Sequence, residues 1–552
     1  MKIGSGAVPA AMALMTAGAA MAGEPAHFTR FAYDGQALER VQAGPGDYRN
    51  PVLSGYYPDP SVTRVGEDYY LVNSSFAHFP GIPVWHSKDL VHWTQIGNAI
   101  DRPGQLDFSG RGASEAVFAP AISWHDGTFY IVNTCVRCKG NFIITARNPA
   151  GPWSDPIWLP FEGIDPSIYW EGDRAYIVNN RAPAEPPRYE GHRAIWIQEY
   201  DWRKGQMVGE STQLVNGGVD LSAKPVWIEG PHIFRKDGYY YLTAAEGGTS
   251  VNHSQVVFRS KDLRGPYQPF AGNPILTQRD LPESRPDPIT SAGHAQLVQT
   301  PKGDWWATFL AVRPYEGDYY NIGRETFLLP VTWRDGWPII LPHRTAIPYA
   351  ASRPDLPQGR AAVPTSGDFA YVDEFAGDRL DMRWIGLRIP ARPFARVAGG
   401  ELILSGGAPL GDQSGVPAFV GRRQQHGRAT MSTTVRFTPT RDGERAGLAA
   451  LQSDRNYAFF GITRVGGRPM LALVTRDKTA NGGEERQVAT APLTGAGPVT
   501  LTIRADGATL AFDYAVAGRT ATLARDVDAR FLSTKAAGGF VGTVVGPYVW
   551  TR

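Results

Sequence analysis

Three things are scarce in this 552-residue sequence: cysteine, an excess of charge of one sign, and long apolar segments. The two cysteines cannot form a four-coordinate zinc site by themselves, and no thioredoxin-like strand–helix–strand pattern surrounds them. The 55 Lys and Arg residues nearly balance the 53 Asp and Glu residues, so the net charge is only +2 and there is no basic field for nucleic acid. Beyond the N-terminus, no apolar segment approaches the ~20 residues of a membrane span. The sequence predicts neither a nucleic-acid partner nor a membrane span.

The N-terminus resembles an export signal. Lys2 supplies positive charge, residues 7–20 are apolar and mostly small, and Ala20-Met21-Ala22 fits the small-x-small cleavage pattern. We predict a signal peptide over residues 1–22 and an exported mature protein, either periplasmic or secreted. A membrane anchor is the less favoured interpretation, because the apolar run is shorter than a spanning helix requires.

Length and composition favour a folded protein made of several β domains. A chain of 552 residues can form two or three domains with full cores, and 42% hydrophobic with 20% charged residues is ordinary for a globular protein. The 62 glycines and 44 prolines suit many short strands joined by turns. Long amphipathic helical patterns are nearly absent, so we predict an all-β protein.

One pattern recurs five times: a turn with glycine, then paired aromatic or apolar residues in a short strand. The five copies are at residues 66–72, 126–132, 172–178, 237–242 and 303–307. Repeats of this size are typical of β-propeller blades, which close in a ring around one axis. The pattern predicts a five-bladed β-propeller.

Four of the five repeats carry a polar residue in nearly the same register, seven to nine residues ahead of the turn glycine. These residues are Asp59, Asp165, Glu229 and His294, whereas the second repeat has apolar Phe118 and Ala119 there. Equivalent positions in a propeller lie at equivalent places around its axis. Three carboxyl groups and one imidazole are therefore expected to converge on one pocket.

The domain organisation follows from composition. We assign residues 45–349 to the propeller and residues 350–368, which contain three prolines among small residues, to a linker. From residue 369 to residue 552 the sequence changes to alternating strands, such as 429–437 and 499–503, which predict an antiparallel β-sandwich.

Three convergent carboxyl groups have an evident use in glycoside hydrolysis. One carboxylic acid protonates the leaving oxygen, and one carboxylate on the opposite face attacks the sugar or activates a water. A third carboxylate beside the acid keeps that acid protonated near neutral pH. Asp59, Asp165 and Glu229 supply three such groups.

The ordered motifs of the chain strongly resemble glycoside hydrolase family 43, in its β-xylosidase and α-L-arabinofuranosidase branch. In the first domain they include Tyr57-Pro58-Asp59-Pro60-Ser61, Phe79-Pro80-Gly81-Ile82-Pro83, His86-Ser87-Lys88-Asp89-Leu90, Asp165-Pro166-Ser167, Glu229-Gly230-Pro231-His232, Glu246-Gly247-Gly248-Thr249, Gly293-His294 and Gly323-Arg324-Glu325-Thr326. In the second domain they are Asp373-Glu374-Phe375, Trp384 and Arg422-Arg423-Gln424-Gln425-His426. The resemblance covers nearly all of the mature chain and implies a concanavalin A-like sandwich after the propeller.

The resemblance also implies residue roles. Asp59 would be the general base of an inverting reaction, Glu229 the general acid, and Asp165 the residue that tunes the pKa and orientation of the acid. Sugar-binding positions would be Phe76, Phe118 and Arg324, and His294 would help to hold Ca²⁺ or another ion near the axis. No organic cofactor is implied.

Each of these residues also has a structural interpretation. Asp-Pro pairs are common in turns, Glu229 can be a solvated strand-end acid, and His294 can be a core histidine. Phe76 and Phe118 can fill blades, and Arg324 can form a structural ion pair. The shared register and the ordered motifs favour the catalytic interpretation.

Two positions depart from the resemblance. Val544 is predicted to stand where close relatives often direct a Phe from the sandwich toward the mouth of the active site, and Phe118 replaces the commoner Trp. Both changes affect walls of the pocket, so they bear on substrate preference more than on the reaction type.

Cys135 and Cys138 follow the aromatic strand of the second repeat, and we predict a local disulfide that stiffens a loop.

The sequence therefore predicts an exported, inverting exo-glycosidase that removes terminal xylose from β-1,4-linked xylo-oligosaccharides. An α-L-arabinofuranosidase acting on arabinose-bearing oligosaccharides, as the sole or a second activity, remains open. A non-catalytic carbohydrate-binding propeller is the alternative from a different class. An oligomer is compatible with the sequence.

Overall fold

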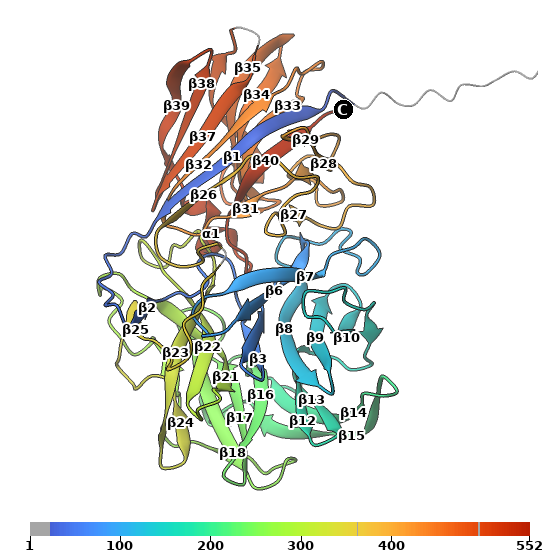
Figure 1. Cartoon of the computed structure of the whole chain (residues 1–552), viewed down its shortest axis with the longest axis vertical. Coiled ribbons are helices and arrows are strands. Elements are labelled where there is room, and N and C mark those ends of the chain that lie inside the picture. The colour runs from blue at the N-terminus through green and yellow to red at the C-terminus, as the bar shows by residue number, and fades with distance from the viewer. Residues whose placement is uncertain (1–22, 362, 495–496) are drawn as a thin grey trace, which may run out of the picture.

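The computed structural model describes residues 23–361, 363–494 and 497–552, and it divides into two β domains (Figure 1). The predicted signal peptide, residues 1–22, lies outside the described residues. The propeller occupies the lower half of Figure 1 and the sandwich the upper half. Within the described residues the one α-helix is the single turn α1 (Thr534–Ala537), so the predicted all-β fold is confirmed.

Five antiparallel sheets form the blades of the propeller. Blade 1 contains β3 (Ser61–Val65), β4 (Asp68–Val72), β6 (Gly81–Ser87) and β7 (Thr94–Ile100); blade 2 contains β8 (Ala116–His125), β9 (Thr128–Val136), β10 (Gly140–Ala146) and β11 (Ile157–Trp158). Blade 3 contains β12 (Ile164–Glu171), β13 (Arg174–Arg181), β14 (Ala194–Asp201) and β15 (Gln206–Asn216). Blade 4 contains β16 (Glu229–Lys236), β17 (Tyr239–Glu246), β18 (Ser254–Ser260), β19 (Gln268–Pro269) and β20 (Leu276–Thr277); blade 5 contains β21 (Thr290–Gln299), β22 (Trp305–Val312), β23 (Glu325–Arg334) and β24 (Trp337–Ile339).

The five-fold sequence repeat corresponds to the first hairpin of each blade. Its glycines have positive φ, for example 62° at Gly66 and 72° at Gly127, which a residue without a Cβ adopts at little cost. The paired aromatics pack between neighbouring blades. Tyr70 of blade 1 meets Phe129 of blade 2 with ring centres 4.8 Å apart, and Phe234 of blade 4 meets Trp305 of blade 5 at 4.9 Å. These rings bury large apolar areas at the blade contacts and so stabilise the ring of blades.

The propeller is closed at its start and end. Blade 5 contacts blade 1 through the innermost strands β21 and β3. Outside the blades, β2 (Asp47–Arg49) pairs with β25 (Ala350–Ser352) and so joins the first and last segments of the domain. Leu53 also donates its backbone N–H to the carbonyl of Thr326 at 3.2 Å.

Two antiparallel sheets form the sandwich. One sheet contains, in order, β28 (Ala395–Ala398), β29 (Glu401–Leu404), β1 (Ala26–Gln36), β32 (Arg428–Arg436), β37 (Val499–Asp506), β38 (Thr509–Val516) and β39 (Arg519–Asp528), with β26 (Phe369–Asp373) also on β1. The other contains β30 (Ala418–Phe419), β40 (Val544–Trp550), β33 (Arg445–Ser453), β34 (Asn456–Val465), β35 (Arg468–Arg476) and β36 (Glu485–Pro492), with β31 (Arg422–Arg423) also on β40. The two inner faces meet in a core where, for instance, Phe460 and Phe512 pack with ring centres 5.4 Å apart.

Strand β1 is the part of the sandwich that the sequence analysis assigned to no domain. It runs through the middle of the first sheet, drawn in blue among the orange and red strands of Figure 1, and pairs with β26, β29 and β32. A register shift between Phe28 and Phe31 interrupts its alternation of buried and exposed residues. The sandwich therefore contains both ends of the described chain.

The two domains share one apolar cluster and a short strand pair. The cluster joins Phe76 and Ile131 of the propeller to Phe459 and Tyr548 of the sandwich. Next to it, β5 (His78–Phe79) pairs with β27 (Gly386–Leu387). This contact fixes the sandwich over one end of the propeller, which matters for the site described below.

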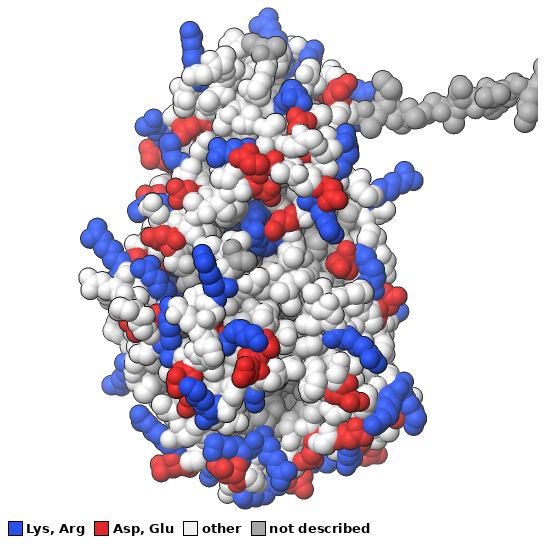
Figure 2. Space-filling view, viewed as in Figure 1, with Lys and Arg blue, Asp and Glu red and all other residues white. Residues whose placement is uncertain are grey.

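The surface agrees with the near-neutral net charge. Figure 2 shows basic and acidic side chains interspersed over the viewed face of both domains. Across the described ranges, 23–361, 363–494 and 497–552, we find no helix with the length and apolar character needed to cross a bilayer.

Candidate active site

One pocket of about 180 Å³ contains every site residue proposed from the sequence. Its lining residues are Asp59, Phe76, Phe118, Ala119, Ile164, Asp165, Trp227, Glu229, Gly248, Thr249, His294, Arg324 and Phe540. All but Phe540 belong to the propeller, and Phe540 comes from the sandwich. The pocket therefore lies where the two domains meet.

In four blades, one residue just before or within the innermost strand has an unusual backbone conformation. Asp59, Asp165 and His294 each have φ of 52°. In blade 4 the positive φ of 56° belongs to Gly230, so Glu229 stands one residue earlier than the three others. Since successive residues of an extended chain point in opposite directions, this offset gives Glu229 a direction of its own. Asp59, Asp165 and His294 are thus the equivalent set, and Glu229 corresponds to the position before each of them.

Asp59 lies in a polar environment that favours its ionised form. Its Oδ2 accepts a hydrogen bond from Ser74 Oγ at 2.6 Å, and its Oδ1 lies 3.3 Å from Nη1 of Arg324 and 3.8 Å from Nδ1 of His294. Arg324 is itself held by a 2.9 Å hydrogen bond to Thr249. Burial alone would raise the pKa of Asp59, but the Arg324 charge, followed by the His294 and Ser74 contacts, outweighs burial and lowers it.

Glu229 and Asp165 have the opposite tendency. Burial, and then the negative charge of Asp59, raise the pKa of Glu229 to about 7. Burial, and then the charges of Glu229 and Asp59, raise the pKa of Asp165 well above its usual range. Oxygens of these two carboxyl groups lie within 4.8 Å of each other, so the pair retains a proton near neutral pH. One pocket thus combines Asp59, whose pKa is lowered, with a carboxyl pair that shares a proton near neutral pH.

Three histidines surround the axis in neutral form. Burial lowers the pKa of His232 to about 3 and that of His253 to about 4, and it also lowers the pKa of His294. A ring nitrogen of His294 lies within 4.8 Å of oxygens of Asp165 and Glu229. Nδ1 of His253 donates to the carbonyl of Ser291 at 3.0 Å, which leaves a lone pair on Nε2.

The donors around His294 are compatible with a cation. Within the described part of the chain, Nε2 of His253 is buried and has no hydrogen-bond partner. The imidazole of His294 is the donor left for a divalent ion, because the neighbouring Asp165 and Glu229 retain a proton between them. Because Ca²⁺ prefers oxygen ligands, His294 would reach Ca²⁺ through a water.

Comparison with known proteins bears on these residues. The profile described as "Glycosyl hydrolases family 43" matches residues 48–338, and the profile of the "Beta xylosidase C-terminal Concanavalin A-like domain" matches residues 372–552. The chain belongs to glycoside hydrolase family 43. It is an enzyme that cleaves glycosidic bonds, rather than a non-catalytic binding propeller.

Several relatives of this family 43 enzyme cover about three quarters of its length or more. A "Non-reducing end alpha-L-arabinofuranosidase" of Bacteroides ovatus is 36% identical over 93% of both chains. A "Xylosidase/arabinosidase" of Butyrivibrio fibrisolvens is 40% identical over 74% of this chain and 78% of its own. The crystal structure of a family 43 protein (GH43_12) from a capybara gut metagenome is 37% identical with a TM-score of 0.88, covering 95% of this chain and 99% of the other. These matches confirm the five-bladed propeller and the concanavalin A-like sandwich.

Aromatic rings form the apolar wall of the pocket. The ring centres of Phe76 and Phe118 lie 5.2 Å apart, and Phe540 stacks on Phe76 at 5.8 Å and meets Phe118 edge-on at 5.5 Å. The guanidinium of Arg324 lies 5.3 Å from the Phe540 ring centre. The sandwich thus supplies one ring to a wall that the propeller otherwise forms.

The expectation for Val544 was wrong. Val544 is fully buried in β40, where its backbone pairs with Arg423 and Leu451 and its side chain belongs to the apolar cluster shared by the two domains, and it does not line the pocket. The loop that precedes β40 reaches the propeller instead and carries Phe540, four residues earlier. In this family 43 enzyme a phenylalanine of the sandwich domain, Phe540, therefore lines the pocket.

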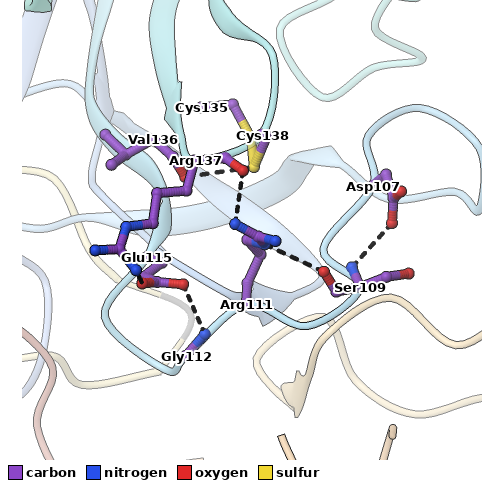
Figure 3. Close-up of a disulfide and its surroundings, with 9 residues drawn as sticks. All are labelled: Asp107, Ser109, Arg111, Gly112, Glu115, Cys135, Val136, Arg137 and Cys138. Atoms are coloured by element: carbon purple, nitrogen blue, oxygen red, sulfur yellow. Dashed lines mark hydrogen bonds and ion pairs between the residues drawn. A yellow bond between two sulfur atoms is a disulfide. The ribbon is translucent and has the colours of Figure 1, made fainter. Parts of the chain in front are cut away.

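Cys135 and Cys138 form the predicted disulfide at the end of β9 (Figure 3). The turn that it closes holds Arg137 at φ 59°. The carbonyl of Arg137 accepts a hydrogen bond from Arg111 at 2.7 Å, and its side chain forms an ion pair with Glu115 at 2.8 Å. The disulfide turn is thus joined to the neighbouring loop, residues 107–115.

The 107–115 loop in turn supports the aromatic wall. Glu115 accepts a hydrogen bond from the backbone N–H of Gly112 at 3.0 Å, which closes the loop on itself. Ser114 Oγ accepts a hydrogen bond from the backbone N–H of Phe540 at 2.9 Å. The disulfide turn is therefore linked to the sandwich ring in the pocket through one intermediate loop.

Several pocket residues were not identified from the sequence. Ser74, Thr249, His253, Trp227 and Phe540 contact or line the site. Thr249 occurs in the quoted motif Glu246-Gly247-Gly248-Thr249, which could have indicated it. No local sequence pattern identified Phe540 as a pocket residue, because its position depends on how the sandwich packs on the propeller.

Proposed function

We propose that this family 43 enzyme removes terminal xylose from β-1,4-linked xylo-oligosaccharides with inversion of configuration. The proposal is carried by one pocket that lowers the pKa of Asp59 and raises the pKa of Glu229 to about 7, since inverting hydrolysis requires one carboxylate base and one carboxylic acid. Asp59 activates a water, and Glu229 protonates the leaving oxygen. Asp165 keeps Glu229 protonated and oriented.

The remaining pocket residues bind the sugar. Arg324, held by Asp59 and Thr249, offers guanidinium N–H groups to sugar hydroxyls. Phe76 and Phe118 enclose its apolar faces. The pocket is bounded by side chains of both domains, which suits removal of one terminal unit.

An α-L-arabinofuranosidase activity, alone or beside the first, is the second candidate. It is favoured by the names of relatives, because one that aligns over 93% of the chain is an arabinofuranosidase and another is named for both activities. Xylopyranose and arabinofuranose can present similarly placed hydroxyls to the same acid and base.

We further propose export to the periplasm or the medium, on the basis of the signal-like residues 1–22.

We also propose a Ca²⁺ or similar ion near the axis, held by His294 directly or through water. Its positive charge would favour the ionised form of Asp59. Exhaustive chelation is expected to lower the melting temperature or the activity, and Ca²⁺ to restore it. An unchanged melting curve with no metal by elemental analysis would make His294 a core residue.

A panel of aryl β-D-xyloside and aryl α-L-arabinofuranoside, with the anomer of the product read by NMR, tests the proposal. We expect turnover of the xyloside with α-xylose as the first product. A first product of retained configuration would contradict the role of Asp59. Turnover of the arabinofuranoside alone would overturn the xylose preference and leave the acid and base roles standing.

A further inference from the structure

Trp227 is an aromatic residue presented at the lip of the pocket, two residues before Glu229. It lines the pocket, yet 38% of its surface is exposed. Its φ is 49°, a left-handed conformation that a bulky residue adopts only when its surroundings enforce it. Such residues cluster at active sites and ligand clamps.

The backbone around Trp227 is fixed on both sides. Its N–H donates to the carbonyl of Gly191 at 3.0 Å, and the carbonyl of the preceding residue, Val226, accepts from the N–H of Gly247 at 2.9 Å. These bonds tie the segment before β16 to two other loops. They hold the indole at the lip rather than in a blade core.

Arg193 supports the ring. Its guanidinium lies 4.8 Å from the centre of the Trp227 ring system, and its Nε donates to Asn180 Oδ1 at 2.8 Å. An arginine anchored in this way keeps the indole from rotating away and is itself attracted to the ring face. Val226, also exposed, adds apolar surface beside it.

The position of Trp227 relative to the acid decides what it can bind. Under the proposed function, Glu229 protonates the oxygen that joins the departing group to the cleaved sugar, so the departing group lies beyond Glu229. Trp227 borders the same pocket as Glu229 and is part exposed. The rings of Phe76 and Phe118 are more deeply buried, so Trp227 lies nearer the open end through which a departing group leaves. The cleaved sugar occupies the part enclosed by Phe76, Phe118 and Phe540.

We propose that Trp227 is the stacking platform for the leaving-group sugar, and that it makes the enzyme select oligosaccharides over glycosides with small leaving groups. This inference rests on the proposed function and adds a specificity-determining residue to it. The ligand class is a pyranose with equatorial hydroxyls, such as the second xylose of xylobiose. The C–H faces of such a ring are apolar and can cover an indole.

The test compares Trp227→Ala and Trp227→Phe with wild type on three substrates, xylobiose, methyl β-D-xyloside and β-D-xylosyl fluoride. The fluoride leaves as an ion and has no ring to stack. We expect Trp227→Ala to lower the ratio of kcat/KM for xylobiose to kcat/KM for the fluoride by about tenfold, and Trp227→Phe to retain most of that ratio. Trp124→Ala is the matched control, because Trp124 is 40% exposed in blade 2 but does not line the pocket.

Three outcomes would overturn the proposal. A loss on methyl β-D-xyloside as large as that on xylobiose would mean that Trp227 only positions Glu229, because methanol needs protonation to leave but has no ring to stack. Equal losses on xylobiose and the fluoride would mean that Trp227 supports the cleaved sugar or the base, and an unchanged ratio would mean that Trp227 binds no sugar. A failed xylose assignment is recognised separately, because wild type would then release arabinose and no xylose. In that case the ratio of kcat/KM for an arabinosylated xylo-oligosaccharide to kcat/KM for arabinofuranosyl fluoride tests whether Trp227 binds the leaving-group sugar.

Discussion

The propeller and the sandwich contribute to the pocket in different ways. The propeller supplies every titratable group that lines it: Asp59, Asp165, Glu229, His294 and Arg324. The sandwich supplies one apolar ring, Phe540. This division indicates that the propeller determines whether a bond is cleaved, while the sandwich affects which sugar is held. The predictions below test this division.

Asp59→Asn is expected to have the largest effect. Removal of the base costs about 10⁴-fold in kcat on every substrate, since no leaving group relieves the need to activate water. Steady-state kinetics on aryl xylosides with good and poor leaving groups checks this. Near-normal turnover of any of them would mean that another residue is the base.

Glu229→Gln separates the acid from the base. We expect a loss of about 10²–10³-fold on poor leaving groups and a much smaller loss on dinitrophenyl xyloside, which leaves without protonation. A plot of log kcat against leaving-group pKa should therefore be steeper for the variant than for wild type. Identical slopes would argue against an acid role.

Asp165→Asn tests the coupling between the carboxyl groups. The acid must be protonated, and the pKa of Glu229 is about 7, so kcat/KM of wild type should fall as pH rises through about 7. The lowered pKa of Asp59 keeps the base ionised well below that pH. Asp165 and Glu229 share a proton as a coupled pair, so replacing Asp165 by an amide removes the repulsion that opposes loss of that proton, and the basic limb should shift to lower pH. A basic limb that stays in place would make Asp165 a binding residue.

Phe540→Ala tests the contribution of the sandwich. We expect KM to rise up to about tenfold with kcat little changed, because an aromatic wall contact is lost while the acid and base remain. Phe531→Ala, a sandwich-core change away from the pocket, is the control for general destabilisation. A loss in kcat as large as that of Glu229→Gln would end the proposed division between the domains.

The double variant Cys135→Ser, Cys138→Ser should have the smallest effect. The disulfide closes a very short loop, so it removes little entropy from the unfolded chain and the melting temperature should change by only a few degrees. Because the turn supports the 107–115 loop, and through Ser114 the backbone of Phe540, KM should change by a few fold. Unchanged KM together with a collapse in melting temperature would contradict this local role.

The parts predicted from the sequence are those that depend on neighbours in the chain. The glycine turns and aromatic pairs identified all five blades, because each first hairpin is a local structure. The register of Asp59, Asp165 and His294 indicated their convergence for the same reason. The one-residue offset of Glu229 was not apparent, since only the backbone shows that Gly230 takes the equivalent conformation.

The parts that sequence reasoning missed depend on distant packing. Val544 was expected at the pocket, but a strand buries it and the loop before the strand delivers Phe540. The partners of β1 lie far along the chain, as in the hydrogen bond from Thr433 to the carbonyl of Arg30 across 403 residues. No local pattern connects segments so far apart.

Strand β1 has a consequence for how the protein is made. The ribosome synthesises β1 before the propeller, and its partner β32 emerges only after the whole propeller. The propeller, built from contiguous hairpins, can fold as soon as its last blade appears, whereas the sandwich must wait for the end of the chain. Until then β1 remains an unpaired apolar strand and a target for chaperones or aggregation. A circular permutant that begins at β2 and carries β1 after β40 would remove this delay.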